Sequence, residues 1–260
     1  MPTPLPLRSF GYWAFQYKRT WRSSLTSSFL NPILFLAAMG VGLGSLVDKS
    51  AQSSSQLGGV SYLVFLAPGL LAASAMQTAA QESTYPVMGA IKWIRTYHAM
   101  LATPLRIIDV LVGHLAWIAV RLLLVTTVFV IVMAAFGATE SWTVIFAIPA
   151  AILTGMAFAA PIAAFAATRN DDVSFAALFR FLVIPMFLFS GTFFPVTQLP
   201  LLLRLVAYLT PLWNGVDLCR DLALGEFPVG RTILHVAYLT VWVVVGVVAG
   251  ARTYRRRLVN

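Results

Sequence analysis

Two arginines within apolar segments are the side chains best placed to act on a bound molecule inside a membrane. Arg121 lies fifteen residues before Phe136, near the inner edge of its segment, and Arg180 lies two turns into another. A guanidinium there can extend to the polar boundary, pair with an acid of a neighbouring helix, or contact an anionic headgroup. We favour the first two roles for both arginines and keep the third open.

Other chemistry is missing from the sequence. No Gly-x-x-x-x-Gly-Lys-Ser/Thr loop occurs, so energy from ATP would need a partner chain. His98, His114 and His235 do not have zinc-ligand spacing, and the single cysteine, Cys219, excludes a multi-cysteine cluster. The nine acidic residues lie in loops or near helix ends, which leaves no obvious carrier for protons or sodium ions. We expect no catalytic residue, no metal site and no cofactor bound by this chain.

The elements that position the arginines are hydrophobic helices. Of the 260 residues, 59% are hydrophobic and 10% charged, and the mean hydropathy is +0.83. A soluble domain carries about a quarter charged residues, so the sequence predicts an all-α integral membrane protein. The net charge of +9 indicates basic residues on the cytoplasmic side of a membrane rather than nucleic-acid binding.

Six membrane-spanning helices are expected, since roughly 20 apolar residues cross a hydrocarbon core of about 30 Å. Asn31-Pro32 is expected to open the first span, and Thr103-Pro104 the third. With both termini in the cytoplasm, twelve Lys and Arg residues lie inside and four outside, which the positive-inside rule favours. We place the spans at 29–47, 60–81, 107–136, 142–167, 173–194 and 232–251.

Residues 1–28 form a cytoplasmic tail and an amphipathic helix. Basic residues interrupt the segment, so it is not a cleaved signal peptide. Its aromatic residues fall in one arc of about 120°. We expect a helix in the membrane interface, with aromatic side chains in lipid and basic ones on anionic headgroups; burial against the protein's own spans is the alternative. The residues assigned to this helix are Trp13, Tyr17, Lys18, Trp21 and Arg22.

Two loops are too long to be simple turns. Loop 82–106, on the cytoplasmic side, has Val87, Ile91 and Ile94 on one side of a predicted short amphipathic helix. The external loop contains two apolar stretches, at 199–209 and 212–224. A helix of about 12 residues is only about 18 Å long and cannot cross the membrane. We therefore expect a re-entrant helical hairpin over 195–226, before the last span.

The most specific sequence pattern follows the fifth span. Residues 189–200 read Phe-Ser-Gly-Thr-Phe-Phe-Pro-Val-Thr-Gln-Leu-Pro, followed by Leu-Thr-Pro-Leu at 209–212 and a stretch through Asp217 and Arg220. With Leu-Ala-Thr-Pro-Leu-Arg at 101–106, this resembles the membrane subunits of type-2 ABC exporters, the permeases of bacterial drug, lipid and glycoconjugate efflux systems. The resemblance covers essentially the whole chain. The nodulation-factor and daunorubicin-resistance branches look closest, because no nucleotide-binding domain is fused to the chain.

The resemblance implies two permease chains, identical or sister, paired with two separate ABC ATPase subunits in the bacterial plasma membrane. The ATPases would bind ATP and Mg, and this chain would be a non-catalytic subunit that contacts membrane lipid but no nucleic acid. Residues 1–28 would be a connecting helix, and loop 82–106 of the six-helix domain 29–260 would hold a coupling helix that docks in an ATPase groove. The residues assigned to that contact are Tyr85, Met88, Lys92, Trp93, Arg95 and Tyr97.

One departure from the family pattern lies in this loop. Many relatives carry a Glu-Arg-Glu-type run, whereas residues 89–95 read Gly-Ala-Ile-Lys-Trp-Ile-Arg. This difference from the relatives predicts that the loop makes a more apolar contact with a particular cognate ATPase.

The resemblance also implies a mechanism. Closure of the ATPase dimer on ATP would push the coupling and connecting helices and shift the permeases as rigid bodies. A substrate would enter between the permeases and leave beneath the hairpins, past phenylalanines whose simpler interpretation is helix packing. The residues assigned to the path or exit gate are Arg121, Phe187, Phe189, Phe193, Phe194, Pro195, Pro200 and Pro211.

The spans are mostly aliphatic and alanine-rich, which favours an amphipathic drug, lipid or lipid-linked substrate moved outward. Two alternatives remain. One is a polysaccharide or teichoic-acid exporter, which should expose aromatic and polar rings along its path. The other is a membrane scaffold or enzyme without a transport role, which needs converging polar residues that the sequence supplies sparsely.

Overall fold

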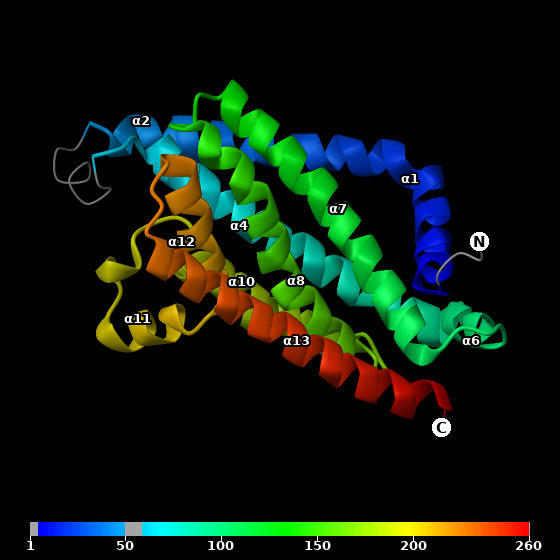
Figure 1. The fold of residues 1–260 in the computed structure, drawn as a ribbon. Coiled ribbons are helices and arrows are strands. Elements are labelled where there is room, and N and C mark those ends of the chain that lie inside the picture. Colours follow the sequence, from blue (N-terminus) through cyan, green and yellow to red (C-terminus); the bar gives the residue numbers. More distant parts are fainter. Residues whose placement is uncertain (1–4, 50–58, 260) are drawn as a thin grey trace.

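The computed structural model describes residues 5–49 and 59–259, without the side chains of residues 20 and 23–28. The described residues form helices joined by turns and contain no strand, which confirms the all-α prediction (Figure 1). Five helical stretches are long and apolar enough to cross a membrane. The fifth expected span, 173–194, corresponds to a shorter apolar stretch, Val173–Phe189. The five long stretches are Phe29–Val47, Tyr62–Trp93, Ile107–Ala135, Trp142–Ala166 and Val229–Val259.

The first expected span is not a separate helix. Helix α1 (Leu5–Phe35) continues directly into the π-helical η1 (Leu36–Leu43) and α2 (Gly44–Val47). Pro32 lies inside α1 and does not open a span, so the predicted boundary between residues 28 and 29 is wrong as a helix end. Instead, α1 bends, and its first part runs at a steep angle to the remainder (Figure 1).

Four further long elements complete the bundle. Helix α4 (Tyr62–Ser83) packs against both α7 (Ile107–Ala135) and α8 (Ala147–Ala166), which also contact each other; α8 follows the 3-10 turn η3 (Trp142–Phe146). Helix α13 (Val229–Val259) packs along α8 (Figure 1). Alanine, with its small side chain, and glycine, which has none, let these helices approach closely: a Cβ at Gly246 of α13 would lie 2.5 Å from Cδ of Pro161.

The loop between α4 and α7 is mostly helical. α5 (Tyr85–Met88) and the π-turn η2 (Gly89–Trp93) extend the direction of α4, and α6 (Thr96–Leu101) follows a break at Ile94-Arg95. Thr103-Pro104 does not open α7, as expected, but lies in a turn in which Thr103 Oγ1 donates to the Met100 carbonyl at 2.6 Å. Arg106 precedes α7, and its N–H donates to Asp109 Oδ2 at 2.9 Å.

The segment before α13 contains short helices. α9 (Val173–Leu178), η4 (Phe179–Val183) and α10 (Ile184–Phe189) end at a turn where Gly191 has a φ of 82°. That turn explains why the fifth apolar stretch stops at Phe189 rather than at residue 194.

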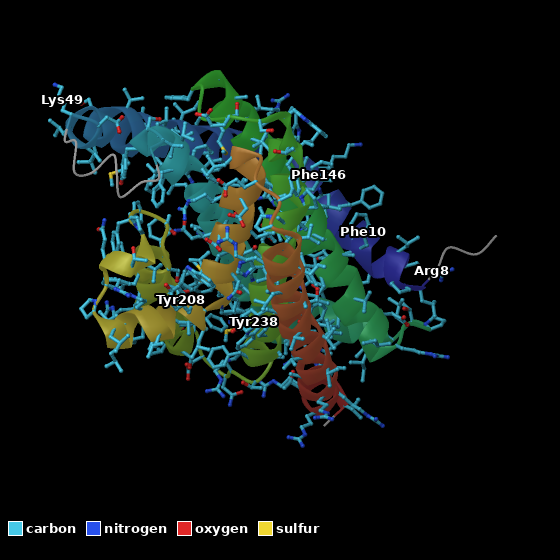
Figure 2. The ribbon with its side chains drawn as sticks, turned by 60° about the vertical axis from the view of Figure 1, so that its left-hand side comes forward. Arg8, Phe10, Lys49, Phe146, Tyr208 and Tyr238 are labelled. Atoms are coloured by element: carbon cyan, nitrogen blue, oxygen red, sulfur yellow. The ribbon has the colours of Figure 1, made fainter. Side chains whose placement is uncertain are left out.

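A helical hairpin follows, as predicted. After η5 (Val196–Gln198), α11 (Leu201–Tyr208) lies outside the bundle and α12 (Pro211–Leu224) packs against α4 and α8. Thr210 Oγ1 accepts from the Trp213 N–H at 3.2 Å and caps α12. Tyr238 of α13 donates to the Leu209 carbonyl, beside Tyr208 (Figure 2). Entry of this hairpin into the outer leaflet stays a prediction.

Candidate functional site

A polar pocket opens between α1, α4, α7 and α10. It has a volume of about 130 Å³. Between residues 64 and 80 of α4, the residues that are not fully buried are Ser74, Gln77 and Thr78, all of which line this pocket. Gln81 and Glu82 continue the same helix face, because residues three and four apart lie above one another. We call this the intramembrane pocket; its other lining residues are Asn31, Pro32, Phe35, Leu70, Arg121, Val125, Phe129 and Phe187.

This polar face corrects the expectation that few polar residues converge within the bilayer. Its sequence signal is the spacing of residues 74, 77, 78, 81 and 82, which a hydropathy average over the whole span conceals.

An ion pair lies at one end of the pocket. Arg121 Nε is 3.1 Å from Glu82 Oε1, and the two side chains are 12% and 22% exposed. The guanidinium also lies over the Tyr17 ring, 4.6 Å from its centroid. Its Nη1 atom is buried and has no hydrogen-bond partner among the described residues. Of the roles considered for Arg121, the interhelical ion pair is the one observed.

A second pocket, of about 340 Å³, lies on the other side of this ion pair. Glu82 and Arg121 line both pockets. The other walls come from the first part of α1, including Tyr12 and Gln16, and from the loop that contains Trp93. We call it the loop pocket. Glu82 and Arg121 therefore lie between the residues of the loop and the intramembrane pocket.

The predicted coupling residues fall into two groups. Tyr85, Lys92, Trp93 and Arg95 are exposed, with 56% of Trp93 accessible. Lys92 Nζ donates to the Asn170 carbonyl at 2.6 Å, so this ammonium already contacts the loop after α8. These four positions remain available to a partner.

Met88 and Tyr97 are buried, and their assignment to a protein contact is wrong. Met88 faces the core because α5 prolongs α4, and it is 2% exposed. Arg95 has a φ of 58°, and the chain turns there, which carries the Tyr97 ring inward at the start of α6. The Tyr97 hydroxyl shares a hydrogen bond of 2.6 Å with His114 Nδ1. Burial, with the neighbouring Tyr254, raises the pKa of Tyr97 well above its ordinary value.

The aromatic face of the N-terminal helix packs against α7 at two positions. The Trp13 ring stacks on His114 with centroids 4.1 Å apart, and Tyr17 meets Trp117 at 5.3 Å. Close approach is possible because a Cβ at Gly113 would lie 2.7 Å from the Pro6 carbonyl oxygen. The structure therefore shows the alternative, burial against the protein, for Trp13, whereas Tyr17 is only half-buried and its lipid contact stays a prediction.

The outer part of this helix differs from that packed face. Trp21 is 43% exposed, and Lys18 and Arg22 are exposed as well. The Arg22 guanidinium lies 5.7 Å from the centroid of the Trp21 ring. Trp21, Lys18 and Arg22 therefore still fit an interface with lipid.

The four phenylalanines do not form one surface. Phe187 meets Phe193 edge-to-face at 5.0 Å and lines the intramembrane pocket. Phe189 is exposed, and Phe194 packs with Trp213 in a small separate cluster. The three prolines stand at helix starts: Pro195 precedes η5, Pro200 precedes α11, and Pro211 is the first residue of α12.

Arg220, which was not assigned a role from sequence, connects the turn after α10 to α4. Its Nη2 donates to the Gly191 carbonyl at 2.9 Å and its Nε to the Phe65 carbonyl at 3.2 Å. The guanidinium also lies 3.8 Å from the centroid of the Phe65 ring. In the sequence, Arg220 could have been singled out because it lies in the stretch through Asp217 and Arg220 that carries the family resemblance.

A second polar network joins α12 to α13. His235 lies between Asn214 Oδ1 at 2.8 Å and Asp217 Oδ2 at 3.1 Å. Arg231 binds both carboxylate oxygens of Asp221, at 2.6 and 3.0 Å. Burial alone would raise the pKa of Asp217, but the hydrogen bond from His235 and the charge of Arg231 hold it below its ordinary value.

Comparison with known proteins gives the family. The profile described as ABC-2 type transporter matches residues 12–224. The chain belongs to this family. Nodulation protein J of Rhizobium leguminosarum bv. trifolii is 34% identical over 247 residues, 94% of this ABC-2 chain and 90% of that protein. Nodulation protein J of Bradyrhizobium diazoefficiens is 35% identical over 240 residues, with 92% and 88% covered, and that of Azorhizobium caulinodans is 26% identical over 208 residues, with 80% and 79% covered.

The chain is therefore a multi-pass membrane protein of the ABC-2 permease family. Within the ABC-2 fold, the structure brings Arg121 and Phe187 to one pocket and leaves Phe189 and Phe194 away from it. Among the described residues, no group of three or more His, Cys, Asp or Glu side chains could hold a metal ion.

Proposed function

We propose that this ABC-2 permease is the transmembrane part of an ATP-driven exporter that moves an amphipathic drug, lipid or lipid-linked substrate outward. A separate ATPase would supply the hydrolysis, bound through the exposed part of loop 82–106. The observation that carries the proposal is the ion pair between Glu82 and Arg121, because it stands between this loop and the intramembrane pocket.

The position of the loop directly after α4 supports coupling to that helix. α5 and η2 follow α4 after a single non-helical residue, Thr84, and lead to Trp93, so a push on the exposed Trp93 would be passed through this bend to the helix that carries Gln77 and Gln81. ATP would bias the permease by binding better to one ATPase arrangement than to the other, since only differential affinity shifts a conformational equilibrium.

The pocket lining supports an amphipathic substrate. Amide and hydroxyl groups on α4 can hydrogen-bond a polar head, and Phe35, Phe129 and Phe187 offer an apolar wall to a tail. A polysaccharide without an apolar part would leave that wall without a matching group. The match to the ABC-2 type transporter family supports a transport role for the chain.

We also propose that both termini lie in the cytoplasm of a bacterium, with the chain in its plasma membrane beside a second permease chain. The end of α13 and the loop that contains α6 lie at the same end of the molecule (Figure 1). Exposed arginines 252, 255 and 256 add to the positive charge of this end.

The test is reconstitution of the permease with its cognate ATPase in proteoliposomes, with both ATP hydrolysis and transport measured. Trp93→Ala and Arg95→Ala should reduce transport by about tenfold or more while the protein stays in the membrane, because an interface anchor typically contributes above 1 kcal/mol. Trp142→Ala is the matched control, since Trp142 is 76% exposed and lies at the start of η3, away from this loop. Unchanged transport in both loop variants would refute the coupling assignment.

A further inference from the structure

A third hollow, separate from both pockets, lies between the start of α7 and the end of α13. This groove has a volume of about 750 Å³. Aliphatic side chains form most of its walls, among them Leu105 and Ile108 on one side and Leu258 on the other. We call it the basic groove, because each wall also carries an arginine, Arg106 and Arg255.

The charged side chains that line the basic groove are both positive. Arg106 and Arg255 are exposed, and neither forms an ion pair with any described residue. The nearest acid in the sequence, Asp109, is 8% exposed and accepts the backbone N–H of Arg106. Among residues 5–49 and 59–259, no carboxylate lines the groove. Within this part of the chain, the site therefore has two cationic groups and no neutralising carboxylate.

The level of the groove matches the boundary of a membrane. Arg106 immediately precedes the apolar stretch Ile107–Ala135, and Arg255 lies near the end of the stretch Val229–Val259. Guanidinium groups at span ends lie at headgroup level, whereas the aliphatic walls between them face acyl chains. Figure 1 shows the two helix ends converging at one side of the molecule.

We propose that the basic groove binds one anionic phospholipid. Its phosphate is held between Arg106 and Arg255, since a guanidinium binds phosphate oxygens with paired N–H donors. An acyl chain lies against Ile108 and Leu258. Basic pockets between spans are the usual sites for such headgroups. The inference does not rest on transport, because a lipid here bridges α7 and α13 whatever the permease carries.

The experiment uses the full chain in phosphatidylcholine nanodiscs with phosphatidylglycerol as the minor component, and native mass spectrometry after release counts the retained lipid. The wild type should retain one phosphatidylglycerol per chain in preference to phosphatidylcholine. The double variant Arg106→Gln/Arg255→Gln should weaken that preference by about thirtyfold, from the contribution of two basic residues at a membrane surface. Arg252→Gln/Arg256→Gln removes the same charge at exposed positions outside the groove and should retain the lipid.

A third variant separates shape from charge. Ala251 lines the groove, and Ala251→Trp fills it while leaving every arginine in place. Loss of the retained lipid in this variant, with a normal elution profile, supports an acyl chain in the groove.

Three results would overturn the proposal. Equal lipid loss in the two double variants would mean that general surface charge attracts the lipid. Displacement of phosphatidylglycerol by an equal concentration of inorganic phosphate would make the groove a phosphate site without an acyl contact. Exclusion of the lipid when the cognate ATPase is bound would make the groove a protein-docking surface.

Discussion

Arg121 stays inside a membrane protein because one carboxylate accompanies it. Glu82 supplies that carboxylate from the last turn of α4, and the Tyr17 ring covers the guanidinium. Removal of one member of a buried pair leaves an uncompensated charge, which is far more costly than loss of both. Variants of Glu82 and Arg121 can therefore show whether the ion pair stabilises the fold, takes part in transport, or does both.

Glu82→Gln should lower the free energy of unfolding by about 3 kcal/mol, because Arg121 loses its partner while remaining mostly buried. Thermal unfolding in detergent measures the change. Glu226→Gln removes an exposed acid and serves as the control. The double variant Glu82→Gln/Arg121→Leu should recover part of the loss; an unfolding temperature equal to that of the wild type in Glu82→Gln would show that the pair does not stabilise the fold.

Arg220 makes a second residue-scale prediction. Arg220→Lys keeps the charge but cannot donate to two carbonyls through a planar group, so it should destabilise the fold by about 2 kcal/mol. The turn at Gly191 should then become accessible, which limited proteolysis at that turn would detect. Arg180→Lys, at an exposed position, is the matched control. Equal protease resistance of the two variants would contradict the prediction.

At the scale of elements, the positions of the apolar stretches were predictable because hydropathy is summed over a whole helix. Their ends were less so. Helix α1 stays helical past the predicted boundary and contains Pro32, and Thr103-Pro104 forms a turn where an N-cap was expected. The amphipathic pattern of the first helix identified which residues form its apolar face. Periodicity does not tell whether that face contacts lipid or another helix. The Trp13 contact with His114 needs tertiary information.

The break between η2 and α6 allows a prediction about Arg95. Its φ of 58° is unfavourable for a residue with a Cβ, so Arg95→Gly should stabilise the fold by about 0.5 to 1 kcal/mol. The same variant removes an exposed guanidinium proposed to contact the ATPase, so transport should fall while stability rises. Thermal unfolding and transport are measured on one preparation, with Arg95→Ala as the comparison. A less stable Arg95→Gly protein would show that the left-handed turn needs the arginine side chain.

At the scale of the whole molecule, the two ends of the bundle differ in charge. Lys49 and Arg8 lie at opposite ends of the first long helical stretch (Figure 2). Most basic residues lie at the end that holds the C-terminus of α13 and loop 82–106. This distribution predicts the orientation of the protein in the membrane.

Cysteine labelling in intact cells tests the orientation. Burial raises the pKa of the Cys219 thiol to about 12, so the wild-type chain should be unreactive and act as the blank. A membrane-impermeant maleimide should label Glu140→Cys from outside and should label Arg256→Cys only after the cells are opened. The reverse pattern would place both termini outside.

The Arg220 contact on Phe65 has a mechanical consequence for α4. One end of that helix is anchored through the Phe65 carbonyl, Pro68 interrupts its backbone hydrogen bonding just beyond, and the far end reaches the exposed Trp93. We expect this helix to pivot near Pro68 when a force reaches it through the bend at Thr84. A force applied at Trp93 would displace Gln81 further than Ser74, so the intramembrane pocket would widen first at the end that the Glu82 ion pair occupies.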